Sequence, residues 1–263
     1  MSTTRPSILE STDYLIGIDD TDVIGSRGTG RLSQLLIAEL REQGLGRALG
    51  ATRHQLLVDP RIPYTSHNSS ACIAWDAEDI ADRDALVAAA AAFLVRESAD
   101  GADPGLAVVD PAALDAEQRA RLVAYGASAK TNVLDQPTAR MLAADLGIHL
   151  SGHGGTEDGV IGSLAATGLH LSGGDGLFLW MEGIRQLDGT CTYAELQATV
   201  PIDDAAAPDG SRPAPGDEII LGDWVRPILA EGRALLLLDQ PEQEPGGGVT
   251  SWRVSPRDVV KRH

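Results

Sequence analysis

Three aspartates stand close together near the start of the chain, at Asp19, Asp20 and Asp22. They follow residues 14–18, a short apolar run that predicts a buried strand. Carboxylates this close raise one another's pKa unless a cation lies between them. Magnesium is the usual cation for such a group, with substrate phosphates completing its coordination shell. The pattern predicts a Mg2+ site in which all three aspartates are metal ligands and catalytic carboxylates. The alternative is that they only form a loop and cap the next helix.

A glycine-containing loop follows at residues 23–30 and leads into a predicted helix at residues 31–43. Backbone N–H groups in such a loop and at a helix N-terminus bind anions, so amides for the phosphates would stand beside carboxylates for the metal. The loop is not a P-loop, because the chain has no G-x-x-x-x-G-K-[ST] motif. We expect ATP as the cofactor. The predicted nucleotide-binding residues are Thr21, Gly25, Arg27, Gly28, Thr29, Gly30 and Arg31.

Two further polar loops are candidates for the substrate site. Residues 62–70 bring together hydroxyls, an imidazole and an amide, although composition alone favours a solvated connection. Residues 151–159 form a Gly-rich loop whose acidic residues would repel a bare phosphate and suit a cationic substrate. A tight turn with close helix packing is the alternative for this second loop. The candidate substrate-binding residues are Thr65, His67, Asn68, Gly152, Gly154, Gly155, Asp158 and Gly159.

Strands and helices alternate through the first two-thirds of the chain, and the last third is richer in strands. This order predicts an α/β (α+β) fold. Residues 1–12 are expected to be a flexible tail, and residues 205–216 an exposed loop. Helices are expected at 31–43, 82–98, 112–124, 137–146 and 160–167. Strands are expected at 14–18, 49–58, 71–75, 106–109, 148–150, 177–181, 219–221, 234–238 and 250–254.

Composition excludes several classes of protein. The 263 residues include 38 acidic and 21 basic ones, a formal net charge of −17, whereas nucleic-acid binders usually carry a basic footprint. Nucleic acid is therefore an unexpected partner, although a local basic patch is compatible with this balance. Two cysteines cannot supply a four-thiolate zinc ribbon. The longest apolar run, residues 85–95, is too short to span a bilayer, and residues 1–12 lack the apolar core of a signal peptide. A cytoplasmic protein without membrane association is expected, and a homo-oligomer is left open.

Three segments together resemble one family. They are Gly-Ile-Asp-Asp-Thr-Asp at residues 17–22, Ile-Pro-Tyr with the following polar run at 62–71, and Gly-Val-Ile-Gly-Ser-Leu-Ala-Ala-Thr-Gly at 159–168. In this order and spacing they resemble the archaeal tRNA-isoleucine 2-agmatinylcytidine (agmatidine) synthetases. That family uses ATP to attach agmatine to a cytidine of the tRNA anticodon. The resemblance implies a kinase-like α/β domain over residues 13–126 and a ferredoxin-like domain over residues 127–263.

Departures from the family pattern affect the expected substrate. The family continues into an oligonucleotide-binding fold and a zinc ribbon, and we expect neither of them here. Arg31 falls where the family carries an autophosphorylated Thr, and Thr29 lies two residues earlier. Thr65, Ser66 and His67 replace family Lys and Arg residues, and Asp158 replaces an Arg. Each of these last changes removes positive charge near the expected site, which favours a small-molecule acceptor over tRNA.

Three functions remain open from the sequence. The first is an ATP- and Mg2+-dependent ligase or phosphotransferase acting on a small molecule, with an amine as the expected acceptor because of the acidic second loop. The second is a non-catalytic protein that binds a nucleotide or metabolite, which the changes at Arg31 and Asp158 favour. The third is a tRNA-modifying enzyme that uses a partner chain to bind tRNA.

Overall fold

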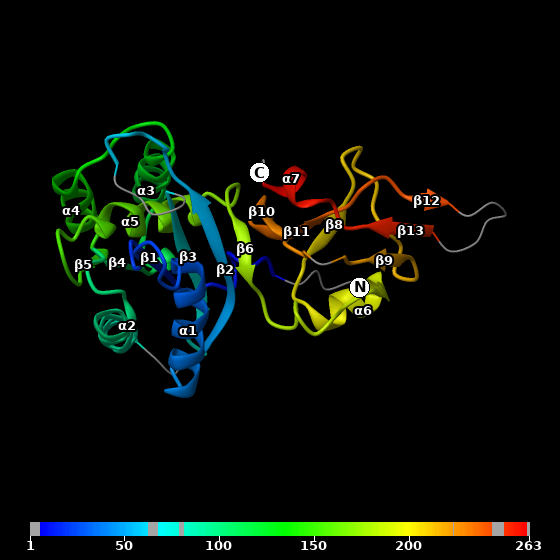
Figure 1. Cartoon of the computed structure of the whole chain (residues 1–263), viewed down its shortest axis with the longest axis horizontal. Helices are drawn as coiled ribbons and strands as arrows, with labels where there is room; N and C mark the ends of the chain where they lie inside the picture. Colours follow the sequence, from blue (N-terminus) through cyan, green and yellow to red (C-terminus); the bar gives the residue numbers. More distant parts are fainter. Residues whose placement is uncertain (1–5, 63–67, 79–81, 223, 244–249, 262–263) are drawn as a thin grey trace.

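The computed structural model describes residues 6–62, 68–78, 82–222, 224–243 and 250–261. It has a mixed α/β fold built on a nine-stranded sheet, which confirms the predicted fold class (Figure 1). Neighbouring strands of this sheet are antiparallel except for the last pair, which is parallel. In spatial order the strands are β5 (His149–Gly152), β4 (Gly105–Val109), β1 (Tyr14–Asp19), β3 (Ser69–Asp76), β2 (Arg47–Gln55), β6 (Leu177–Trp180), β10 (Ile228–Ala230), β11 (Arg233–Leu237) and β8 (Asp204–Ala206).

Helices cover both faces of the β1 region of the sheet. On one face, α1 (Thr29–Glu42) and α2 (Arg83–Glu97) share a core with alternate residues of β1, such as Ile16 and Ile18. The intervening residue Leu15 belongs to the core on the other face. Because β1 is buried on both faces, its sequence is a continuous apolar run rather than an alternating one. The helices of the second face are α3 (Ala116–Ala129), α4 (Gln136–Asp145) and α5 (Gly159–Leu171).

Helix α5 lies unusually close to the sheet, because glycines form the contact. A Cβ on Gly17 of β1 would approach the Ser163 carbonyl of α5 closer than 3.0 Å, a separation that real Cβ atoms do not show. A Cβ on Gly105 of β4 would collide in the same way with the backbone of Gly159. On its other side, α5 meets α3 through Gly168 and Gly126. The glycines of this segment therefore serve close packing, which brings the start of α5 to the end of β1.

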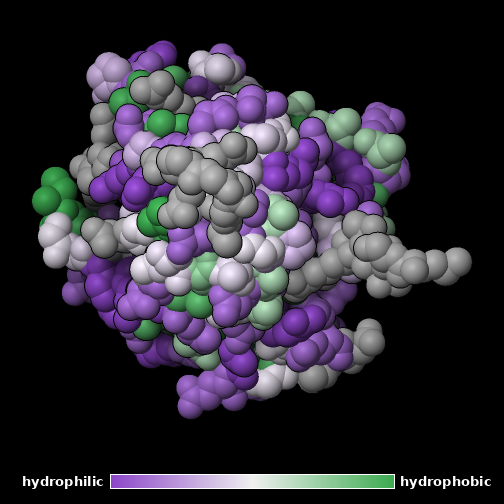
Figure 2. All heavy atoms as spheres, turned by 90° about the vertical axis from the view of Figure 1, so that its right-hand side faces the viewer, coloured by the Kyte–Doolittle hydropathy of each residue, from purple (hydrophilic) through white to green (hydrophobic). Residues whose placement is uncertain are grey.

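A second, four-stranded sheet lies at the far end of the molecule (Figure 1). Its strands, in spatial order, are β12 (Glu242–Gln243), β13 (Thr250–Arg253), β9 (Glu218–Ile220) and β7 (Thr190–Thr192). The short helices α6 (Tyr193–Thr199) and α7 (Arg257–Val260) belong to the same half of the chain. Seen from this end, hydrophilic residues cover most of the visible surface and hydrophobic ones are scattered among them (Figure 2). Within the part of the chain that the structure describes, no helix is long and apolar enough to cross a bilayer.

Several predicted elements differ from the structure. The helix expected at 112–124 is split into a 3-10 turn at Pro111–Ala113 and α3, because Asp110 caps the turn and Asp115 forms a capping box with Gln118 at the start of α3. The loop expected at 205–216 begins inside strand β8. The helix expected at 160–167 extends to Leu171, and the elements β7, α6, β8, β10, β12 and α7 were not predicted.

Two boundaries of the predicted division, after residues 12 and 126, do not coincide with boundaries of structural elements. Within the expected tail, residues 6–12 are packed: the Ile8 side chain is buried, and the Thr12 hydroxyl donates a hydrogen bond of 2.6 Å to the Ile8 carbonyl. The predicted boundary after residue 126 falls inside α3, which continues to Ala129. The division into a kinase-like and a ferredoxin-like domain stays a prediction.

Candidate functional site

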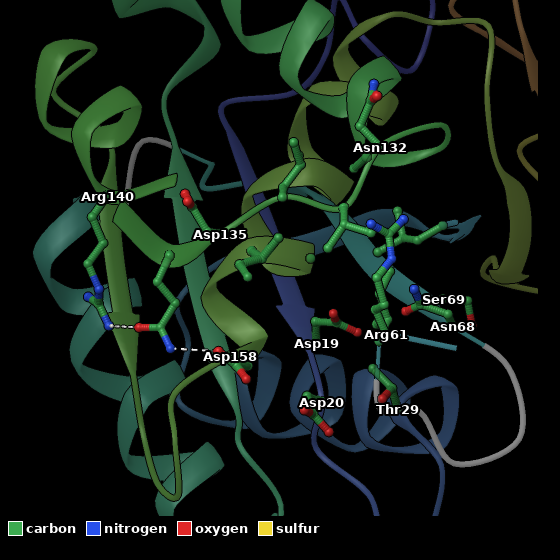
Figure 3. Close-up of a pocket in the computed structure, with 18 of the residues that line it drawn as sticks. Asp19, Asp20, Thr29, Arg61, Asn68, Ser69, Asn132, Asp135, Arg140 and Asp158 are labelled. Carbon is green, nitrogen blue, oxygen red and sulfur yellow. Dashed lines mark hydrogen bonds between the residues drawn. The ribbon is translucent and has the colours of Figure 1, made fainter. Parts of the chain in front are cut away.

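A cavity of about 600 Å3 opens at the end of strand β1 (Figure 3). Its walls come from the β1–α1 connection, the segment after β2, the start of β3, the α3–α4 connection and the start of α5. Arg61, Asn68 and Ser69 lie on one side in Figure 3, and Arg140 and Asp158 on the other. The cavity thus unites segments separated by more than a hundred residues. The predicted site residues that line it are Asp19, Asp20, Asp22, Thr29, Asn68 and Asp158.

The backbone at the end of β1 turns sharply. Asp19 is the last residue of the strand, and Asp20 adopts a left-handed conformation with φ of 50°. A non-glycine residue is uncommon there, although Asp and Asn tolerate it better than other side chains. Without this turn, the side chains of Asp19 and Asp20 would point to opposite faces, as successive residues of a strand do. The turn lets both carboxylates line the same cavity.

Burial and mutual repulsion make these two carboxylates easy to protonate. The Asp19 side chain is half-buried at the wall of the cavity, and this burial, with the nearby Asp20 and Asp22 charges, raises the pKa of Asp19 to about 8. Partial burial and the charges of Asp103, Asp22 and Asp158 raise the pKa of Asp20 to about 6. The charged neighbours that shift these two pKa values are all carboxylates among the described residues. A cation bound between Asp19 and Asp20 would lower both pKa values again.

Asp22 has a structural role as well. One of its carboxylate oxygens accepts hydrogen bonds from the Thr29 backbone N–H (3.3 Å) and hydroxyl (3.0 Å) at the start of α1. The buried Thr21 hydroxyl donates to the Thr29 hydroxyl at 3.0 Å. The capping alternative therefore holds for Asp22, while its side chain still lines the cavity.

The three aspartates do not form a ready-made metal cage. Among the described residues, no three carboxylate, imidazole or thiol groups lie close enough together to hold a metal ion. Magnesium is commonly held in proteins by one or two carboxylates plus substrate phosphates, and the Asp19–Asp20 pair matches that simpler arrangement.

The glycine loop before α1 contributes less to the cavity than expected. Of its predicted nucleotide-binding residues, only Thr29 lines the cavity, and its N–H already has Asp22 as acceptor. The Arg27 guanidinium forms an exposed ion pair with Glu97 at 3.1 Å, and the Arg31 guanidinium donates to Gln34 in its own helix. The remaining predicted residues of this loop, Gly25, Gly28 and Gly30, are not part of the described lining.

Two arginines that sequence reasoning missed supply the positive charge of the cavity. Arg61 lies after β2 and is held by a bidentate pairing with Asp59, with both N–O distances 2.8 Å. Arg140 on α4 pairs with Glu157 at 2.6 Å and also donates to Gln136. Both residues line the cavity. Arg61 stands one residue before the Ile-Pro-Tyr segment, which was the only local signal for it.

The second Gly-rich loop is mainly a packing device. A Cβ on Gly155 would collide with the Asp103 carboxylate, and one on Gly152 with the Glu157 side chain. Gly159 is similarly confined by the backbone of Gly105 and Asp103, and Gly154 is not part of the described lining. The close-packing alternative accounts for these glycines. Only Asp158 of this loop lines the cavity.

Asp158 is linked by hydrogen bonds to two polar side chains of α4. Its carboxylate accepts a hydrogen bond of 2.7 Å from Gln136, and Gln136 accepts one of 3.3 Å from Arg140 (Figure 3). In the other polar loop, Asn68 lines the cavity and donates to the Leu57 carbonyl at 2.6 Å. Thr65 and His67 lie outside the described residues.

The raised pKa values predict how stability depends on pH. In the folded, metal-free protein Asp19 and Asp20 keep protons that the unfolded chain releases, so the free energy of unfolding falls as pH rises from about 4 to about 8. Asp19→Asn removes the larger part of this dependence. Chemical denaturation of wild type and variant across this range measures it, with the exposed Asp84→Asn as a matched control. If the free energy of unfolding depended on pH in the same way in wild type and Asp19→Asn, the raised pKa of Asp19 would be contradicted.

No protein-family model matches the chain, and no curated protein does either. Solved structures do. One is a tRNA fluorescent labeling enzyme, with 27% sequence identity and a TM-score of 0.50 over 59% of this chain. Another is TiaS, a tRNA agmatidine synthetase, in complex with an isoleucine tRNA and ATP, with 26% identity and a TM-score of 0.50 over 60% of this chain.

The matches span only part of those proteins. The aligned region covers 35% of the labeling enzyme and 36% of the TiaS chain. The resemblance inferred from the three sequence segments is thus confirmed at the level of structure. Over about three-fifths of its length, this chain is structurally similar to the agmatidine synthetase TiaS.

Proposed function

We propose that this chain is an ATP- and Mg2+-dependent enzyme, similar to agmatidine synthetase, that activates or ligates a small molecule carrying an amine. The observation that carries the proposal is the cavity at the end of β1, where Asp19 and Asp20 meet under mutual repulsion. Its structural similarity to TiaS, which has been solved with ATP, supports the choice of nucleotide.

The cavity suits ATP in size and lining. Its volume of about 600 Å3 lies within the range of roughly 300–1,000 Å3 usual for pockets that hold such ligands. Apolar side chains, among them Leu56, Val133 and Ile161, can contact the base. Arg61 and Arg140 stand at opposite sides, where their guanidinium groups can neutralise phosphate charge.

The carboxylates suit Mg2+. Asp19 and Asp20 offer hard oxygen donors, and a divalent cation would remove the repulsion that raises their pKa values. Magnesium bound there would neutralise charge that develops on the phosphates during group transfer. The protein itself then contributes positioning and electrostatic stabilisation, which are the main demands of phosphoryl chemistry.

The acidic lining favours an amine as acceptor. Five carboxylates face two guanidinium groups in the described lining: Asp19, Asp20, Asp22, Asp135 and Asp158 against Arg61 and Arg140. This surplus exceeds what one divalent cation neutralises, and a cationic substrate group matches it. Asp158 and Asp135 lie toward the α4 side, away from Arg61, and suit the amine best (Figure 3).

Two other functions remain candidates, each with its own observation. A binding protein without catalysis is favoured by the exposed position of Arg31, which lies outside the described lining of the cavity. A tRNA substrate, held with the help of a partner chain, is favoured by the similar solved structures, because those proteins label or bind tRNA. The net charge of −17 weighs against tRNA.

Thermal unfolding with ATP tests the proposal. ATP with Mg2+ is expected to raise the melting temperature, because a ligand that binds only the native state adds about 2.7 kcal/mol of stability at a hundredfold excess over its Kd. The increase should disappear when EDTA replaces Mg2+. An unchanged melting temperature with every nucleotide would refute the proposal. ATP binding without consumption in the presence of polyamines, small amines and tRNA would favour the binding protein.

A further inference from the structure

A second, smaller pocket lies beside the acidic cavity, at the end of strand β2. It has a volume of about 130 Å3 and is lined by residues from β2, the end of α3, the glycine turn before β6, and the C-terminal helix α7. That volume is well below the roughly 300–1,000 Å3 of pockets for nucleotide-sized ligands. The pocket has room for a small ion or a single functional group.

The lining of this pocket is basic. Arg53, Lys130 and Lys261 line it, with Asp175 as the one carboxylate of the described lining, so cations exceed anions by two. Lys130 and Lys261 are the only two lysines of the whole chain, and they come from positions 131 residues apart. The protein as a whole has a net charge of −17, so a pocket in which cations outnumber carboxylates has the opposite sign of charge from the rest of the chain.

Asp175 offsets only one of the three cations, because both oxygens of its carboxylate already have partners. One oxygen accepts a hydrogen bond of 2.8 Å from the buried His54 ring, and the other pairs with Lys130. Behind His54, the Thr52 hydroxyl lies 2.8 Å from the other ring nitrogen and 2.7 Å from His170. This buried chain fixes the position of Asp175 and, through it, the Lys130 ammonium.

The other two cations have no acidic partner among the described residues. Within the described residues, Arg53 donates to the neutral oxygens of Ser69 (2.9 Å) and Gln55 (3.1 Å), and Lys261 forms no ion pair there. Burial and the nearby Arg257 guanidinium lower the pKa of Arg53. An unpaired, half-buried guanidinium beside a second one is costly unless an anion joins them.

The pocket shares a wall with the acidic cavity. Ser69, the hydrogen-bond acceptor of Arg53, lines the cavity, as do Asn68 and Leu56, whose carbonyl oxygens accept hydrogen bonds from Gln55. A molecule bound in the cavity therefore has a basic pocket beside it. Arginine and lysine in this arrangement are the usual partners of phosphate.

The geometry points to an anion site in this pocket, formed by Arg53, Lys130 and Lys261, that takes a phosphate group. Its assignment to a phosphate carried by the acceptor rests on the proposed function, whereas the site itself does not. An acceptor with an amine for the acidic cavity and a phosphate for the basic pocket would be oriented by opposite charges at its two ends.

Calorimetric titration of the full chain with inorganic phosphate tests the site, at constant ionic strength and without ATP or Mg2+. The wild type should bind, and Arg53→Gln with Lys261→Gln should weaken binding at least about tenfold, because hydrogen bonds to charged groups are strong. Lys130 is left intact, since its loss would strand the Asp175 charge. Arg41→Gln with Arg121→Gln, two exposed arginines outside both linings, removes the same two charges as a control and should bind like wild type.

Equal phosphate binding by wild type and the double variant, or no binding by wild type at millimolar phosphate, would overturn the site. Bulk tRNA binding that depends on Arg53 and Lys261, without phosphate binding, would also overturn it in favour of a polynucleotide surface. Asp20→Asn should keep phosphate binding, because it lies in the other cavity. If wild type binds phosphate but not Mg2+-ATP, the proposed function fails while the anion site stands.

Discussion

Asp20→Asn is expected to fold normally and to lose about 100-fold or more of the ATP consumption that we propose, because preorganised electrostatic groups contribute on this scale. Asn tolerates the left-handed backbone at φ of 50° nearly as well as Asp, so the turn after β1 is retained. The variant removes a negative charge that repels Asp19, Asp22, Asp103 and Asp158. Its melting temperature without metal should therefore equal or exceed that of wild type.

This combination separates a catalytic effect from a folding defect. The measurements are ATP consumption with amine acceptors, Mg2+-ATP binding and thermal unfolding on the same preparations. Asp84→Asn is the matched control, since that carboxylate is 91% exposed on α2 and is not part of the described cavity lining. Wild-type ATP consumption and binding in Asp20→Asn would refute the nucleotide site at the end of β1. A lower melting temperature would instead show that the Asp20 carboxylate stabilises the fold.

Gly17→Ala is expected to destabilise the protein by about 3 kcal/mol or more, at the upper end of the range for inserting a methyl group into a packed core. The new Cβ would meet the backbone oxygen of Ser163 and the Thr167 side chain, both closer than 3.0 Å. Backbone cannot rotate away as a flexible side chain does, so α5 would have to move. That movement would shift the start of α5, including Gly162 against the Asp19 carboxylate.

Urea denaturation measures this effect, with Gly216→Ala as the matched control. Gly216 has no atom within 4 Å of its would-be Cβ and no positive φ, so its substitution should change stability by less than about 0.5 kcal/mol. Equal stability of Gly17→Ala and wild type would show that α5 has room to move from the sheet. The close approach that positions the cavity would then not be a requirement of the fold.

Features that depend on near neighbours in the chain could be predicted from the amino-acid sequence. The apolar run at β1, buried on both faces, and the aspartates at its end were predicted from six or seven consecutive residues. Helix α2 was predicted to within one residue, because its cap Asp82 and its Ala-rich face are local. The mixed α/β class follows from the order of such elements.

Local patterns failed where a competing interaction decided the outcome. The Gly-rich loop at 151–159 suggested a substrate site, yet its residues Gly155 and Gly159 serve contacts with Asp103, Gly105 and the end of β1, which lie far away in the sequence. The short elements β7, α6 and β10 carry too little periodicity to predict, and pairing with distant strands stabilises the two strands among them. Because Asp115 caps α3, that helix begins at Ala116 and not at residue 112, where the sequence pattern had placed its start.

Which charged residues work together became visible only in the folded chain. Arg61 and Arg140 replaced Arg27 and Arg31 as the cations of the acidic cavity, because chain folding brings α4 and the segment after β2 to the end of β1. His54 and Asp175 are 121 residues apart, and the only two lysines meet in one pocket. Electrostatic interactions depend on distance in space and on burial, and neither is encoded by spacing along the chain.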